Sequence, residues 1–546
     1  MNCRSNSIKK VFFLVLSFLA FLSYSCKKDT PSGSTTTTTT TKTTTTSTTP
    51  NLNDTVYNYA KFAYLWDENV PNSFNYNGYQ LYIASADSSP LVQAITLYSP
   101  LNTTNNLHYD HFSFLLTEDQ YNQLFNGTGG STSFGMDFSQ DRNGNFRISY
   151  VAHASPAYSQ GVRRGFELNA INGIAVTANL SAATASQLNT ILDYNSSASF
   201  TLTNASGVQE TLNISKGSFS DDEVINTTVI DSGTHKVGYI AYNTFITSTD
   251  ANGNPNHPGL DTAFSKLKAA GVTDLIIDLR YNGGGYTAVA EELDNAILPP
   301  SVNGQKMYTE TFNDSLNIYH KLFPKDGFPG DSTVYINETS ALNPPKLSIN
   351  NVVFIVSNET VSASELTINN LKPYFPNMKL VGLGKSFPSS KQNTAGKPFG
   401  FFNYPFPLPT ATSVPQYELF LINFETKNAL GQDNYVSGFT PDVQEYDGLE
   451  YDWGNPNEDG YKAAFNYLVK GSFSVSNTNN GLSVGRNSVS SAFKPSSLSR
   501  MHASTHFVGM INKVNRYNSM GNLNTKIQKA KISMKLSGKG NSPIKL

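Results

Sequence analysis

Cysteine is nearly absent from this chain of 546 residues, which contains only Cys3 and Cys26. Both lie close to the N-terminus, so the rest of the chain has no disulfide, no thiolate nucleophile and no cysteine-based zinc site. Cysteine chemistry is therefore excluded from any mechanism in the body of the protein.

Strong net charge and the common cofactor motifs are also missing. The formal net charge is only -2, so no long-range field attracts nucleic acid or an anionic membrane surface. The histidines have no His-Glu-x-x-His spacing, and the glycines at 283–285 are not followed by the Lys-Ser or Lys-Thr pair of a phosphate-binding loop. We expect no metal and no cofactor. A hydrophobic content of 38% is enough for more than one core.

The N-terminus has the pattern of an export signal. Basic residues precede an apolar run at residues 11–22, which is too short to span a bilayer comfortably. Cys26 follows small and polar residues, an arrangement that resembles a bacterial lipoprotein cleavage site. We expect residues 1–26 to be a signal peptide with lipidation at Cys26, ordinary signal cleavage being the alternative. The protein would then be a lipid-anchored protein of the bacterial cell envelope, facing the periplasm or the cell surface.

Two low-complexity segments flank the body of the chain. Residues 27–55 are mostly Thr, Ser, Pro and Lys, and residues 471–546 contain Lys and Arg but no Asp or Glu. Neither composition buries enough apolar surface to offset chain entropy. We expect a Thr-rich linker and a disordered basic tail, which either docks on an acidic surface or is simply solvated.

The body divides into three predicted parts. Residues 56–128 begin with apolar residues at helical spacing and predict a small helical module. Residues 129–218 combine short alternating strands with one helix near 182–193 and predict a compact β domain. Residues 219–470 alternate strands and helices, which indicates an α/β core.

Two segments of the α/β core carry candidate chemistry. The sequence DLRYNGGG at residues 278–285 follows a buried strand, and its glycines allow a sharp turn with exposed amides that can stabilise an oxyanion. The sequence SASE at residues 362–365 lies between a strand and a helix, so Ser362 or Ser364 could act as a nucleophile at a helix N-terminus. Alternatively, these serines only cap the helix, and Glu365 completes a capping box.

Together these motifs resemble the C-terminal processing, or tail-specific, serine peptidases of family S41. The resemblance also includes Asp110 to Phe114 and the sequence GFTPD at residues 438–442. It implies a crotonase-like ββα protease core in which Ser362 is the nucleophile of a Ser-Lys dyad. Main-chain amides, which fall here on Gly284 and Ala363, would form the oxyanion hole.

The lysine of the dyad has more than one candidate in the sequence. The resemblance places a Gly-Lys pair closer to the serine than the 35 positions (397 minus 362) that separate Lys397 from Ser362. We align Lys397 with this motif by treating residues 383–393 as an insertion. Lys385 is the competitor, and Lys391 is a weaker one.

The β domain resembles a protease-associated PDZ domain. The sequences SPAYSQGVRRG at 155–165 and NAING at 169–173 carry the likeness. A PDZ domain adds a C-terminal peptide as a strand and binds its carboxylate on loop amides. Phe134, Gly135 and Met136 are the candidate loop.

The sequence therefore predicts a serine endopeptidase that cleaves exported proteins near their C-termini. Its partners would be protein or peptide substrates with free C-termini, held by the PDZ-like domain, and a membrane reached through the lipid anchor only. The altered serine-to-lysine spacing motivates an alternative, a lipoprotein of the same fold that binds peptides or other ligands without catalysis.

Overall fold

The computed structural model describes twelve stretches of the chain: residues 51–83, 88–102, 106–110, 112–125, 132–245, 248–249, 255–324, 328–337, 344–384, 401–408, 417–433 and 438–473. The predictions for residues 1–26 with Cys26, for the linker before residue 51 and for the tail after residue 473 lie outside this part. No helix among the described residues is both long enough and apolar enough to cross a bilayer.

The N-terminal segment mixes helices with short strands. Asn51 caps α1 by accepting the N–H of Asn53, and the buried face of α1 packs into the largest hydrophobic core. One strand of this segment, β3, pairs antiparallel with the distant strand β20. The segment that the sequence predicts as a helical module thus contributes a strand to a sheet formed mainly by distant residues. Its elements are α1 (Leu52–Ala63), η1 (Asp67–Asn69), η2 (Tyr76–Gly78), α2 (Pro90–Thr96), β1 (Leu101–Asn102), β2 (Leu107–His108), β3 (Phe114–Thr117) and α3 (Glu118–Phe125).

The second part, which we call the middle module (residues 132–217), has its own sheet and its own core. Its strands are ordered β4-β5-β6-β8-β9 with β7 on β6, and β4 lies at an edge. A bridge between Ser133 and Gly217 brings the two ends of the module together. Its elements are β4 (Met136–Gln140), β5 (Phe146–Val151), α4 (Pro156–Ser159), β6 (Glu167–Ile171), β7 (Ile174–Ala175), α5 (Ala182–Tyr194), β8 (Ser197–Thr203) and β9 (Gln209–Ser215).

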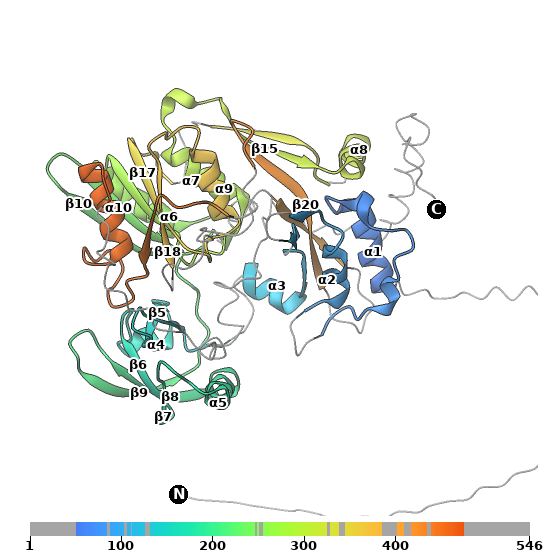
Figure 1. Cartoon of the computed structure of the whole chain (residues 1–546). Coiled ribbons are helices and arrows are strands. Elements are labelled where there is room, and N and C mark those ends of the chain that lie inside the picture. The colour runs from blue at the N-terminus through green and yellow to red at the C-terminus, as the bar shows by residue number, and fades with distance from the viewer. Residues whose placement is uncertain are drawn as a thin grey trace, which may run out of the picture. The chain divides into compact units, whose positions relative to one another are not determined.

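The α/β core is built on a mostly parallel sheet. Its strand order is β10-β11-β14-β17-β18-β21, and only the β10 and β11 pair is antiparallel. One face packs on α10, and the other packs in the core shared with α6, α7 and α9 (Figure 1). Both faces are covered, which is why the central strands are continuously apolar. The elements are β10 (Val224–Asp231), β11 (Lys236–Tyr242), α6 (Pro258–Ala270), β14 (Asp274–Asp278), α7 (Thr287–Ile297), β17 (Asn351–Val356), α9 (Ala363–Leu371), β18 (Lys379–Gly384), β21 (Val443–Tyr446) and α10 (Asp459–Lys470).

A further sheet, ordered β16-β15-β20-β19 with β3 on β20, completes the body. Its residues Tyr308, Leu421 and Phe424 belong to the same core as α7 and α9. This sheet therefore supports the face of the α/β core on which α9 lies. The remaining elements are β12 (Ser248–Thr249), β13 (Pro255–Asn256), η4 (Pro300–Val302), β15 (Lys306–Phe312), α8 (Asp314–Leu322), β16 (Ser332–Tyr335), β19 (Phe401–Pro407) and β20 (Tyr417–Asn428).

Candidate active site

Ser362 occupies a strained turn between β17 and α9. It is the N-cap of α9, with a φ of 61° and a ψ of -119°. Apart from glycine, few residues other than asparagine adopt a positive φ. The other two described non-glycine residues at positive φ are Asn106 and Asn172. Strained serines at strand-to-helix turns are typical of nucleophiles.

The Ser362 side chain is buried at the start of α9. Within the described part of the chain its Oγ has no hydrogen-bond partner, although the residue is fully buried. Ser362 and Glu365 form a capping-box arrangement, in which Glu365 Oε2 accepts the main-chain N–H of Ser362 at 2.8 Å. A buried hydroxyl left without a partner is costly in a purely structural role.

The start of α9 also offers a donor for an anion. Ala363 is the first helical residue after Ser362, and the first N–H groups of a helix have no partner within the helix. They lie at the positive end of the helix dipole. An oxyanion that forms on a carbonyl bound to Ser362 Oγ would therefore find a favourable field at Ala363.

The glycine loop after β14 lies directly against this turn. Gly284 has a φ of 94°, and a Cβ added to it would lie 2.6 Å from Ser362 Cβ and 3.0 Å from Ala363 N. Only glycine fits such a close approach at this φ. The structure thus brings together three residues that the sequence analysis selected, Ser362, Ala363 and Gly284.

Hydrogen bonds join the two turns. Thr360 Oγ1 donates to Leu279 O at 2.7 Å, and Ser357 Oγ donates to Arg280 O. These bonds hold the start of the glycine loop against the start of the turn at Ser362.

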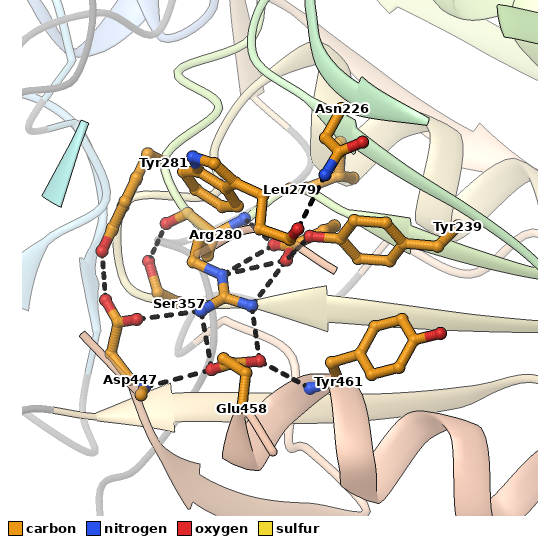
Figure 2. Close-up of polar contacts among 12 residues, drawn as sticks. Asn226, Tyr239, Leu279, Arg280, Tyr281, Ser357, Asp447, Glu458 and Tyr461 are labelled. Carbon is orange, nitrogen blue, oxygen red and sulfur yellow. Dashed lines mark hydrogen bonds and ion pairs between the residues drawn. The ribbon is translucent and has the colours of Figure 1, made fainter. Parts of the chain in front are cut away.

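The buried guanidinium of Arg280 holds the start of the glycine loop in place (Figure 2). Arg280 donates to both carboxylate oxygens of Glu458, at 2.9 and 3.1 Å, and to Asp447 Oδ1 at 2.8 Å. It also binds Asp278, its neighbour at the end of β14, at 2.6 Å. Planar guanidinium groups suit such bidentate pairs with carboxylates.

Asp447 has a second cationic partner in Arg164 of the middle module, at 2.7 Å, and it accepts the hydroxyl hydrogen of Tyr281. Burial alone would raise the pKa of Asp447, but Arg164 and Arg280 outweigh burial and lower the pKa to about 2. Burial opposes ionisation of Glu458 too, yet Arg280 holds its pKa below the usual range. Both carboxylates therefore stay ionised at physiological pH.

The candidate bases lie outside the described residues. Lys385, Lys391 and Lys397 all fall in the interval between residues 384 and 401. The choice among them stays a prediction. Within the described part of the chain, no group of three or more His, Cys, Asp or Glu residues is arranged to hold a metal ion.

The predicted carboxylate-binding loop lies between the Ser133 and Gly217 bridge and the edge strand β4. Phe134 and Met136 are largely buried, at 5% and 6% exposure. Gly135 has a φ of 78°, and its N–H donates to Ser133 Oγ at 3.1 Å. The loop thus lies at the start of an edge strand, and the N–H of Gly135 already has a partner within the protein.

Sequence reasoning missed the residues that hold the loop in place. Asn282 and Arg280 are part of the glycine motif, but the motif gave no role for either side chain. Asp447 and Glu458 lie more than 160 residues further along the chain and carry no local signal. Only the fold brings them to Arg280.

Residues 236–389 match the model of peptidase family S41. The chain is also similar to the crystal structure of a Bacteroides fragilis protein assigned to the S41 proteases, at 20% identity and a TM-score of 0.56, over 77% of this chain and 97% of that one. A weaker likeness is to the photosystem II D1 C-terminal processing protease, at 18% identity and a TM-score of 0.40, over 72% of this chain and 92% of that one. No curated protein matches the chain.

The family match confirms the resemblance to peptidase family S41 for residues 236–389. The structural likeness shows a shared mixed α/β fold with several sheets.

Gly284→Ala should lower kcat on the order of 100-fold, because the added Cβ would push the glycine loop away from Ser362. Gly271→Ala is the matched control: Gly271 also has a positive φ, 69°, but nothing lies within 4 Å of the added Cβ. Both variants place an alanine at a positive φ, and only Gly284→Ala brings the added Cβ into contact with neighbouring atoms. Equal kcat values for the two would show that the close approach is irrelevant to turnover.

Asp447→Asn should make the free energy of unfolding depend less on pH in the acid range. A folded-state pKa of about 2 against 3.8 for the free group means that the stabilisation is present above pH 3.8 and is lost as the pH falls through 2. The variant should lower the free energy of unfolding by about 2 kcal/mol at neutral pH and less at pH 2. Urea unfolding between pH 2 and 7 measures this, with the exposed Asp119→Asn as control. A constant difference across this range would contradict the assignment.

Proposed function

Because residues 236–389 belong to peptidase family S41, we propose that the chain is a serine endopeptidase with Ser362 as its nucleophile. The observation that carries the proposal is the buried, strained Ser362 with an unpartnered Oγ, set between the start of α9 and Gly284. Ser362 Oγ would lose its proton to the base and attack the scissile carbonyl, and the C–N bond would then break as the leaving amine takes up the proton. Water would hydrolyse the resulting acyl-enzyme and restore the serine hydroxyl.

We assign the general base to Lys397. A lysine takes the serine proton only in its neutral form, so its pKa must be lowered by desolvation. Ser-Lys pairs work without a histidine and an orienting carboxylate. Support for Lys397 comes from the sequence motif, and Lys385 remains the competitor.

The middle module would hold the substrate tail. Its order of strands and helices, with the glycine turn at Gly135 before the edge strand β4, suits a PDZ-like module that receives a free C-terminus. Cleavage near the C-terminus of exported proteins follows from this arrangement. Lipidation at Cys26 would keep the enzyme in the cell envelope.

Ser362→Ala should abolish cleavage of unfolded test proteins with apolar C-terminal tails, because no other described serine combines an unpartnered hydroxyl with this turn. Lys397→Ala and Lys397→Arg should abolish it too, since guanidinium stays protonated. The rate of the wild type should rise with pH and then level, because the neutral amine is the active form.

Lys385→Ala is the matched control and should retain most turnover. If Lys385→Ala is inactive and Lys397→Ala is active, the base is Lys385. If Ser362→Ala cleaves as fast as the wild type, the chain is a binding protein of this fold instead.

Amidation of the substrate's terminal carboxylate should slow cleavage of tailed proteins, because the loop at Phe134 to Met136 would lose its anion. Short internal peptides that do not reach the module should be cleaved equally well in both forms. The ratio of kcat/KM values for free and amidated substrates measures the effect. Equal ratios for long and short substrates would show that the module does not receive the C-terminus.

A further inference from the structure

Asn282 is fully buried, and its polar groups are bonded to three different segments of the α/β core. Its Nδ2 donates to Tyr242 O at the end of β11, at 3.0 Å. Its Oδ1 accepts the N–H of Gly284 in the glycine loop, at 2.8 Å. Each end of the side-chain amide thus has a partner on a different segment.

The main chain of Asn282 makes the third connection, to the serine turn. Its carbonyl oxygen accepts the N–H of Val361 at 3.2 Å and the hydroxyl hydrogen of Ser364 at 3.2 Å. These two residues flank Ser362 and Ala363. Asn282 is therefore bonded on both sides of the residues at which an acyl-transfer oxyanion would form.

The bond to Gly284 has a direct consequence for the oxyanion hole. An N–H that donates to Asn282 Oδ1 can serve an oxyanion only if the oxyanion shares this hydrogen or displaces the amide oxygen. Ala363, at the start of α9, has no such competitor within its helix. The two donors of the predicted hole are thus unequal in this structure, and the side chain of Asn282 makes the difference.

We propose that Asn282 is the positioning residue of the oxyanion hole. It holds the glycine loop against the serine turn, and its side-chain amide controls the direction in which the Gly284 N–H points. This role rests on the proposed serine peptidase function. Asn282 would be neither the nucleophile nor the general base of that reaction. Tyr242 takes part only through its main-chain oxygen, so its side chain is not required for the bond.

A positioning role and a structural role affect different measured quantities. Loss of a buried hydrogen-bonding residue lowers stability wherever it lies. A residue that aims an oxyanion donor acts more strongly on the transition state than on the bound substrate, so its loss lowers kcat with little change in KM. The two roles are separable by measuring both quantities together with stability.

The experiment compares Asn282→Ala and Asn282→Asp in the full chain. The expected kcat of Asn282→Ala is lower on the order of 100-fold, with KM changed less than about threefold. Asn282→Asp should be slower still, because its carboxylate holds the Gly284 N–H more tightly and repels an oxyanion. Inhibition by a peptide aldehyde, whose oxygen occupies the oxyanion position once Ser362 Oγ has added to the carbonyl carbon, should weaken in parallel with kcat. Binding of the matching product peptide should not weaken.

Asn313→Ala is the matched control. Asn313 is buried, donates to Phe62 O and Tyr64 O, and accepts the N–H of Leu316, so its side chain makes three hydrogen bonds. It should lose stability in urea unfolding and keep the wild-type kcat. If Asn282→Ala proves too unstable to assay, Ser364→Ala removes one bond to the Asn282 carbonyl, and it should lower kcat several-fold without changing KM.

The proposal is overturned if Asn282→Ala, or Ser364→Ala in its place, loses stability but keeps the wild-type kcat. It is also overturned if aldehyde and product affinities fall together. Ser362→Ala, run in parallel, separates these results from failure of the proposed function. If cleavage is equal with and without Ser362, the proposed serine peptidase function is wrong, whatever the result for the asparagine variants.

Discussion

The buried charge of Arg280 is the constraint on which the geometry of the site depends. A guanidinium without water is tolerable only when carboxylates surround it in good geometry, and here Asp278, Glu458 and Asp447 do so. These partners come from the end of β14, the segment after β21 and the start of α10. Removing one partner would leave an uncompensated charge in the interior. The cluster therefore fixes where the glycine loop leaves the sheet (Figure 2).

Strain at Ser362 is sustained by the same surroundings. A serine at positive φ costs on the order of 1–3 kcal/mol and persists only where neighbouring contacts determine the backbone. The bonds from Thr360 to Leu279 and from Val361 to Asn282 supply those contacts on one side of the turn. The bond from the Ser362 N–H to Glu365 supplies them on the other side. The turn and the glycine loop are thus held as one unit.

The parallel sheet explains why these pieces meet. β14 and β17 are adjacent parallel strands, so the segments after their carboxyl ends emerge at the same edge of the sheet. The glycine loop follows β14, and the serine turn follows β17. α9 then leads away from the edge with its first amide beside Ser362. A ligand bound at this edge would meet both segments.

The sequence alone determined the parts of this protein that depend on local patterns. Strand and helix periodicity predicted β14, β17, α5 and α9, because a 3.6-residue or 2-residue repeat is visible in a short window. The motifs around Gly284 and Ser362 predicted the family, since they combine unusual residues at short spacing. Tertiary structure decided the rest. The pairing of β3 with β20, the carboxylates around Arg280 and the three connections of Asn282 join residues that are far apart in the chain, and only packing selects such partners from many equivalent side chains.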